Sequence, residues 1–250
     1  MVACMTTTTG AGLKDRTVVV VGGGSGIGLA VAREALARGA EVVLAGRSRE
    51  RLARALGALG AGARARAVAA DVRQEDAVVR LFREVPAADH VVATAVVPAY
   101  QPIAAFDLEA ARAVVDSKLL GALLLAKHGA PRLRPGGSLT FTTGIAADRP
   151  MPRGSVIAAV NGALAAFVRA AALELAPLRV NALSPGWVDT EIWDAVAGDG
   201  KAATFAAMAE RLPARRIGRP EDVAHAAAFL MENGFTTGSV LRVDGGHPLV

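Results

Sequence analysis

Apolar residues along the chain alternate between short continuous runs and runs with helical spacing. Thr17–Val21 is a β-branched run that stops at glycine, which is typical of a buried strand. From Ile27 to Arg38 the apolar positions recur with the period of a helix, Gly39 ends that run, and Glu41–Ala45 is a second apolar run. Strand, helix and strand in this order predict a βαβ unit with parallel strands.

The same alternation continues almost to the end of the chain. Further helices are predicted near Arg49–Leu59, Glu75–Val85, Asp107–Leu133, Ser155–Leu175 and Pro220–Met231. Further strands are predicted near Ala67–Ala70, His90–Ala93, Ser138–Thr142, Arg179–Leu183 and Val240–Val243. No linker interrupts the pattern, so residues 15–250 are expected to form one α/β domain. Residues 1–14 show no apolar period and are predicted to be a mobile tail.

Length and composition agree with this organisation. A chain of 250 residues suits one large α/β domain, and 52% hydrophobic with 20% charged residues excludes a disordered protein. The longest nearly apolar stretch, Val156–Val168, is too short to span about 30 Å of hydrocarbon. The first residues lack the charged and apolar regions of a secretion signal. We therefore expect a cytoplasmic protein with no membrane partner.

Charge and metal-binding residues narrow the range of partners. The excess of 28 basic over 23 acidic residues could indicate nucleic acid. However, the arginines stand singly on predicted helix faces, as in Arg47–Arg51, and aromatic residues make up only 4%. No nucleic-acid partner is therefore expected. Cys4 stands alone, and His90, His128, His225 and His247 lack the spacing of metal ligands, so no metal is expected.

A glycine-rich turn follows the first predicted strand and opens directly into a helix. Residues 22–28 read GGGSGIG. In this position glycines let the backbone approach a pyrophosphate, and the helix N-terminal N–H groups stabilise its charge. The residues expected to contact a dinucleotide are Gly22, Gly24, Ser25, Gly26, Ile27 and Gly28. The alternative is a tight turn that holds no ligand, although the turn has more glycines than a plain turn requires.

The segment after the second predicted strand indicates which dinucleotide binds. It contains Arg47 and Ser48 and no acidic residue to bind a ribose 2′-hydroxyl. A guanidinium favours a 2′-phosphate, so NADP(H) is preferred over NAD(H). The alternative for Arg47 is a solvated residue at a helix start. Asp71 and Val72, past the third strand, are placed to bind the adenine; the alternative for Asp71 is a helix N-cap.

From about Thr17 to Gly246 the sequence resembles the short-chain dehydrogenase/reductase family. The glycine turn, Asp71, the pair Pro185 and Gly186, Thr190 and the closing VDGG of residues 243–246 carry the resemblance. It implies a doubly wound Rossmann fold of about seven parallel strands. It also implies a nicotinamide cofactor over the strand ends, redox chemistry on an alcohol or carbonyl, and a homotetramer. The additional cofactor contacts it implies are Ala93, Pro185, Gly186, Val188 and Thr190.

The family's four catalytic positions all carry other residues here. The Tyr that protonates the substrate oxygen aligns with Ile157, and the Lys four residues later aligns with Asn161. The Ser position falls on Gly144, and the Asn position in the preceding long helix falls on Lys118. Lys and Asn have thus exchanged places, which would keep one ammonium near the cofactor. The alternative is chance substitution in a site no longer used.

If chemistry survives, another group must serve as the acid, because isoleucine has no proton to donate. Lys118 and Asn161 are the first candidates, followed by Tyr100, the only tyrosine, and by Thr143 and Asp148. The less specific interpretation is that Tyr100 only packs in its loop and that Asp148 pairs with Arg149 on the surface.

Three functions remain open. The leading hypothesis is an atypical NADP(H)-dependent oxidoreductase that acts on a small carbonyl, enone or imine. The others are an inactive cofactor-binding subunit or sensor, and a non-redox enzyme of dehydration or cyclisation. Trp187 and Trp193, near Thr190, suggest an apolar or aromatic ligand, with core packing as the alternative. The helix Ser155–Leu175 is apolar on more faces than one sheet can cover, which predicts a homo-oligomer, a tetramer or dimer.

Overall fold

The protein folds around one seven-stranded sheet in which every neighbouring pair of strands is parallel. The computed structural model describes residues 12–60 and 62–250. The strand order is β3-β2-β1-β4-β5-β6-β7. The strands are β1 Thr17–Val21, β2 Glu41–Gly46, β3 Ala65–Ala69, β4 Ala88–Ala93, β5 Leu133–Thr142, β6 Arg179–Pro185 and β7 Val240–Val243. The predicted doubly wound α/β fold of about seven parallel strands is confirmed.

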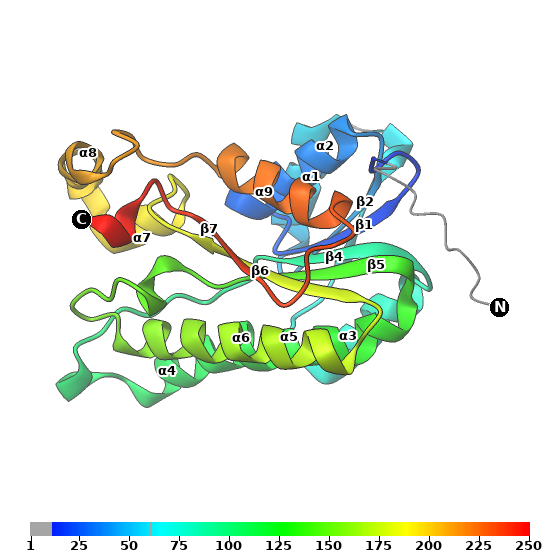
Figure 1. The fold of residues 1–250 in the computed structure, drawn as a ribbon, viewed down its shortest axis with the longest axis horizontal. Helices are drawn as coiled ribbons and strands as arrows, with labels where there is room; N and C mark the ends of the chain where they lie inside the picture. Colours follow the sequence, from blue (N-terminus) through cyan, green and yellow to red (C-terminus); the bar gives the residue numbers. More distant parts are fainter. Residues whose placement is uncertain (1–11, 61) are drawn as a thin grey trace.

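Helices cover both faces of this sheet, as Figure 1 shows. On one face lie α1 Gly26–Ala37, α2 Arg49–Leu59 and α9 Pro220–Glu232. On the other lie α3 Glu75–Glu84, α5 Gly121–Gly129 and α6 Ser155–Glu174, with α4 Leu108–Val114 packed against α6. Two short helices, α7 Ile192–Ala197 and α8 Lys201–Arg211, gather with the C-terminus at one end of the molecule.

The apolar run of β1 is explained by these two layers. Val19 and Val21 face the core that contains α3, α5 and α6, whereas Val18 and Val20 face the core that contains α1, α2 and α9. All four side chains are at most 1% exposed. A strand buried on both faces needs apolar residues at every position, which is why it reads as a continuous run.

The structure corrects the sequence prediction in three places. The helix predicted over Asp107–Leu133 is present but changes type: a π-helical segment, η3 Val115–Leu120, joins α4 to α5 with helical backbone on both sides, and β5 begins at Leu133. Helices α7 and α8 were not predicted. The tail predicted over 1–14 lies outside the described residues up to residue 11, but Leu13 is buried, so the domain boundary at residue 15 is wrong.

Helix α6 extends beyond Val156–Val168, the apolar stretch that was predicted to be too short to span a membrane. Among the described residues it is the one helix that is long and apolar enough to cross a membrane by length and composition. The same test is passed by core helices of soluble proteins, and Ile157, Leu164 and Val168 on α6 are buried in the protein. This finding is therefore weak evidence for a membrane span.

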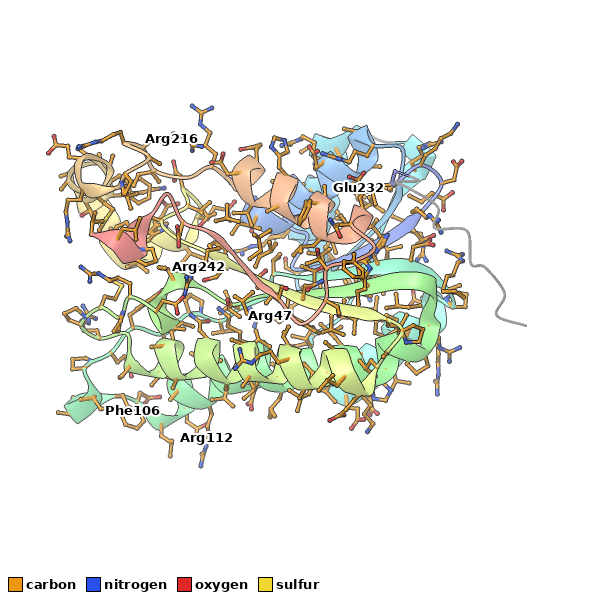
Figure 2. The ribbon with its side chains drawn as sticks, viewed as in Figure 1. Arg47, Phe106, Arg112, Arg216, Glu232 and Arg242 are labelled. Atoms are coloured by element: carbon orange, nitrogen blue, oxygen red, sulfur yellow. The ribbon has the colours of Figure 1, made fainter. Side chains whose placement is uncertain are left out.

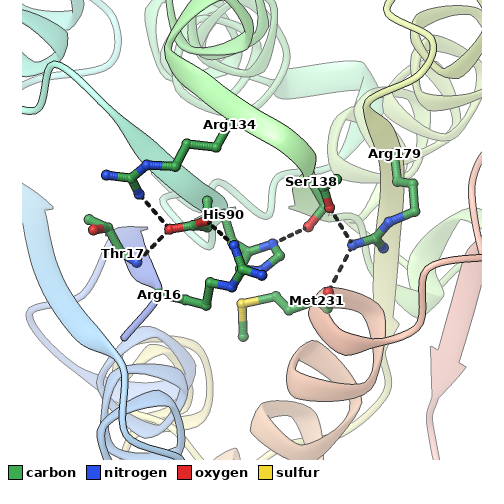
Figure 3. A network of polar contacts seen from close by, with 9 residues as sticks. Arg16, Thr17, His90, Arg134, Ser138, Arg179 and Met231 are labelled. Carbon is green, nitrogen blue, oxygen red and sulfur yellow. Dashed lines mark hydrogen bonds and ion pairs between the residues drawn. The ribbon is translucent and has the colours of Figure 1, made fainter. Parts of the chain in front are cut away.

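A polar network crosses the sheet at the amino ends of its strands (Figure 3). His90, Ser138 and Arg179 are register partners on β4, β5 and β6, and His90 Nδ1 lies 2.8 Å from Ser138 Oγ. Arg179 donates 2.8 Å to the Met231 carbonyl at the end of α9. Burial and the charge of Arg179 lower the pKa of His90 to about 4, so its ring is neutral at pH 7.

Asp89 forms the charged part of the same edge. Its carboxylate accepts hydrogen bonds from the Thr17 N–H at 2.8 Å, from Arg16 at 2.8 Å and from Arg134 at 2.6 Å. Burial by itself would raise the pKa of Asp89. The hydrogen bonds from Thr17 and Arg16 and the charge of Arg134 outweigh it, so the pKa lies below its usual value. One carboxylate thereby ties the start of β1 to β4 and β5.

We predict that Asp89→Asn lowers the free energy of unfolding at pH 7 by about 1–3 kcal/mol, because charge-assisted hydrogen bonds to a buried group are lost. Urea unfolding followed by circular dichroism measures it. Since folding depresses the pKa of Asp89, its contribution is complete above the unfolded-state pKa, near 4, and disappears as pH falls through the folded-state value. Glu109→Gln, in an exposed pair with Arg112, is the control and should change stability by under about 1 kcal/mol. Equal effects of the two variants would contradict the role of Asp89.

Candidate active site

A cavity of about 570 Å³ opens at the carboxyl ends of the strands. Its walls come from the loops that follow β4, β5, β6 and β7, from η3 and α6, and from α7 and α8. The strand order reverses between β1 and β4, and doubly wound sheets bind their ligands in the crevice at such a point. Of the residues predicted for catalysis, Lys118, Asn161, Tyr100 and Thr143 all line this cavity.

The glycine turn crosses close to the strand ends beside the cavity. A Cβ on Gly28 would lie 2.2 Å from the Gly22 carbonyl oxygen, and one on Gly22 would lie 2.6 Å from Thr94 Oγ1. Gly22 also has φ +85°, which disfavours a side chain. Thr94 Oγ1 in turn donates a hydrogen bond of 3.2 Å to the Val21 carbonyl oxygen. At Gly22 and Gly28, neighbouring atoms thus occupy the space that any side chain would need.

The helix that begins in this turn leaves its first N–H groups available. Ser25 is the N-cap of α1 with extended backbone, yet its side chain makes no capping hydrogen bond. No acidic residue lies in the first turn. A bare, glycine-lined helix N-terminus fits the pyrophosphate of a dinucleotide, because its N–H groups and dipole favour an anion.

The predicted nucleotide contacts on β2 and β3 have different surroundings. Arg47 is exposed, and Ser48 caps α2 by accepting a hydrogen bond from the Arg51 N–H at 3.2 Å. Asp71 binds the Arg73 guanidinium, at 2.6 Å for the shortest contact, and this hydrogen bond lowers the pKa of Asp71. The N-cap of α3 is Gln74, so the alternative of an N-cap at Asp71 is wrong. Val72 is buried.

The remaining predicted cofactor contacts lie on β4 and in the loop after β6. Ala93 pairs with Val21 at the end of β4. Gly186 packs so tightly on Asp244 that a Cβ would lie 2.7 Å from its Cα. The Thr190 methyl would lie 3.3 Å from a Cβ on Gly26, so this loop reaches the glycine turn. The other residues of the group, Ile27, Pro185 and Val188, line the cavity together with Gly186 and Thr190.

Lys118 enters the cavity from the π-helical segment. Its Nζ donates to the Thr143 carbonyl at 2.7 Å. Burial lowers the pKa of Lys118 to about 7, because a charged amine loses hydration when it is enclosed. An ammonium has three hydrogens, so two remain for other acceptors. Single π-helical turns occur often at functional sites, and here the turn carries the one lysine of the cavity wall within the described residues.

Asn161, on α6, binds the residue that follows Thr143. Its Nδ2 donates to the Gly144 carbonyl at 3.2 Å, and its buried Oδ1 has no partner within the described chain. Lys118 and Asn161 therefore hold the carbonyls of two successive residues, Thr143 and Gly144. Ile157, one turn before Asn161, is 4% exposed and contributes an apolar wall.

Two hydroxyl groups predicted as candidates differ in what they can donate. Thr143 Oγ1 already donates 3.0 Å to the Leu183 carbonyl, so its one hydrogen is committed to β6. Tyr100 is half-buried in the loop after β4, and burial raises the pKa of its hydroxyl. Tyr100 therefore stays protonated at neutral pH but is a weak acid.

A cluster of aromatic side chains forms part of the cavity wall. Trp187 and Trp193 stack with ring centroids 4.2 Å apart and an angle of 23° between planes. Phe205 of α8 meets both rings edge-on, and His247 meets Trp187 edge-on at 6.4 Å. Lys201 Nζ lies 2.8 Å from both Asp189 and Asp194, which ties α8 to the loop that carries the tryptophans.

The sequence prediction missed part of this end. Asp148 pairs with Arg242 at 3.0 Å, not with Arg149. Arg149, Arg211 and His247 line the cavity, although none was predicted as a site residue. His247 follows β7, so its place at the carboxyl edge could have been inferred from the parallel sheet; Arg211 lies on the unpredicted α8. Among the described residues no group of three or more His, Cys, Asp or Glu could hold a metal.

The fold and the glycine turn define the class of doubly wound α/β proteins with a dinucleotide-type cleft. The family model described as enoyl-(acyl carrier protein) reductase matches residues 22–247. The short-chain dehydrogenase/reductase ucsE of Acremonium sp is 34% identical over 262 residues, covering 97% of this chain and 98% of that protein. The chain belongs to the short-chain dehydrogenase/reductase family.

Two solved structures are similar over nearly the whole chain. A small-chain dehydrogenase in complex with NADPH superposes with a TM-score of 0.83 at 33% identity, covering 95% of this chain and 100% of that one. The MalC reductase/Diels-Alderase of Malbranchea aurantiaca has a TM-score of 0.89 at 30% identity, covering 95% and 98%.

Proposed function

We propose that this protein is an NADP(H)-dependent oxidoreductase that transfers hydride to or from a small carbonyl, enone or imine, with Lys118 as its acid. The observation that carries the proposal is the position of the Lys118 amine, which lines the cavity and donates to the Thr143 carbonyl at 2.7 Å. Membership of a dehydrogenase family and an NADPH-bound structural relative support the redox chemistry.

The cofactor would lie along the switch point of the sheet. The glycine turn would hold the pyrophosphate, and Arg47, exposed after β2, would bind the 2′-phosphate. Thr190 and Gly186 would line the nicotinamide end, since both line the cavity and Thr190 reaches the glycine turn. When bound, NADPH supplies the hydride.

The proton that balances the hydride would come from Lys118. With a pKa of about 7, the amine is roughly half protonated at neutral pH, and an acid is most effective when its pKa lies near the working pH. A proton leaving Nζ for the substrate oxygen, or for the carbon of an enone, leaves a neutral amine that the Thr143 carbonyl still holds. Thr143 and Asn161 are positioning residues in this scheme, and Tyr100 is a second donor from the loop after β4.

A non-redox ring closure is the second candidate. The similarity to a protein named reductase/Diels-Alderase favours it, as does the apolar wall at Ile157, where the family has its proton-donating Tyr. A cyclisation of this kind would need the shape of the cavity rather than an acid. An inactive cofactor-binding subunit or sensor remains the third.

We predict that the protein binds NADP(H) more tightly than NAD(H), and that Arg47→Ala weakens NADP(H) about tenfold or more while leaving NAD(H) unchanged. The reason is the loss of charge-assisted hydrogen bonds to the 2′-phosphate. Calorimetric titration with both cofactors measures this. Equal affinities in the wild type would contradict the role of Arg47. Arg83→Gln, an exposed arginine on α3, is the control.

We predict that Lys118→Met lowers the turnover of NADPH with a carbonyl, enone or imine panel by about 100-fold or more, the usual contribution of a positioned acid. Wild-type reduction should fall as pH rises through about 7, because Lys118 loses its proton. Absorbance of NADPH follows the reaction. Lys127→Met, an exposed lysine paired with Glu75, should keep full activity. A variant at Lys118 with unchanged rates would refute this assignment, and a wild type that binds NADPH but turns over nothing would favour the sensor.

We also propose that the protein is a homo-oligomer that associates through the outer face of α6. Ala159, Ala163, Ala166 and Leu173 are exposed on that face, and Leu123 of α5 is exposed as well. We predict a dimeric or tetrameric mass by light scattering at micromolar concentration, and dissociation on Ala166→Arg, because the charge would be buried at the interface. A monomeric wild type would reject this interface.

A further inference from the structure

The wall of the cavity carries an excess of positive charge. Four charged side chains of the described chain line it: Lys118, Asp148, Arg149 and Arg211. The one carboxylate, Asp148, is already paired with Arg242 at 3.0 Å. Arg149 and Arg211 are exposed, and neither forms an ion pair or a side-chain hydrogen bond within the described residues. Two guanidinium groups thus remain available at the wall of the cavity.

The two arginines line the same cavity as His247 although they come from different elements. Arg149 follows β5, and its backbone N–H donates to the Ile145 carbonyl at 2.7 Å, which fixes the start of its side chain. Arg211 is the last residue of α8. Both act on His247, whose pKa is lowered first by burial and then by the positive charges of Arg149 and Arg211, while Asp244 opposes them. A basic residue at a helix C-terminus is common, but that preference explains only Arg211.

The His247 side chain makes no hydrogen bond with the described residues. It is 7% exposed, lines the cavity, and its buried Nδ1 has no hydrogen-bond partner among the described residues. Buried polar atoms are nearly always paired in native proteins, so an unpartnered one in a cavity wall is open to a water or to a bound ligand. Next to it, the stacked rings of Trp187 and Trp193 offer an apolar surface.

These residues are separated from the expected phosphate sites of the cofactor. Arg47 follows β2 and the glycine turn follows β1, whereas Arg149 follows β5 and His247 follows β7, two strands on the other side of the switch point; Arg211 ends α8. The positive charge at this end is therefore not required by the pyrophosphate or the 2′-phosphate.

We infer that the substrate of this protein is an aromatic or other apolar ring compound that carries a carboxylate. The ring packs against Trp187 and Trp193, and the carboxylate binds Arg149 and Arg211 beside His247. Guanidinium groups bind carboxylates through paired hydrogen bonds, and aromatic side chains bind flat apolar rings. This substrate class rests on the proposed function, because it places the reacting carbon at the Lys118 end of the same cavity.

The test compares two probes that differ only in charge, 3-phenylpropanoate and 3-phenylpropanamide, with saturating NADP⁺ present. Trp187 and Trp193 are the two tryptophans of the whole chain, so intrinsic tryptophan fluorescence reports on this site alone. We expect the carboxylate to bind at least about tenfold more tightly than the amide. The double variant Arg149→Gln and Arg211→Gln should abolish the preference and leave amide binding within about twofold.

The matched control removes two charges elsewhere, by Arg83→Gln and Arg112→Gln on α3 and α4. Neither residue lines the cavity, and Arg112 points away from the molecule in Figure 2. The control should keep the preference. Equal binding of the two probes by the wild type, equal weakening of both by the double variant, or the same loss in the control would each overturn the inference. Turnover is not measured, so a failed NADPH assay counts against the proposed function and leaves this result intact.

Discussion

The close approach of Gly28 to Gly22 is the constraint on which the site depends. A side chain at Gly28 would collide with the Gly22 carbonyl oxygen, so α1 can start directly above β1 only because no Cβ is present. Thr94, at the end of β4, holds the Val21 carbonyl from the neighbouring strand. The two strands on either side of the switch point are thus fastened together where the cleft begins. Thr190 reaches the same turn, since its methyl would lie 3.3 Å from a Cβ on Gly26.

Within that frame, an amine and an amide from two helices hold one short segment. Lys118 from η3 and Asn161 from α6 hold the carbonyls of Thr143 and Gly144. The segment therefore has a fixed shape even though Ile157 offers it no hydrogen bond. The same enclosure that fixes the lysine also lowers its pKa, so position and acidity have one physical cause.

The sequence predicted the sheet well because burial on both faces makes its strands continuous apolar runs, as β1 shows. It predicted the glycine turn because a steric requirement leaves a direct trace in residue type. It did not predict the π-helical segment η3, since such a segment hardly changes the apolar spacing of the helix around it. The helices α7 and α8 were not predicted because they are short and largely exposed, so their sequences show no regular spacing of apolar residues. Arg149 and Arg211 are indistinguishable in sequence from solvated arginines, and only their shared proximity to His247 marks them.

The polar network of Asp89, His90 and Arg179 lies at the amino ends of the strands, and the cavity lies at the carboxyl ends. Strands of about five residues at about 3.3 Å each place the two about 17 Å apart, with apolar core between them. The residues that hold the strands together and the residues that line the cavity therefore lie at opposite ends of the same sheet. Residues of the cavity can therefore change without removing the hydrogen bonds that hold the amino ends of the strands. A substitution that changes the chemistry at the carboxyl edge need not lower the stability that the amino edge provides.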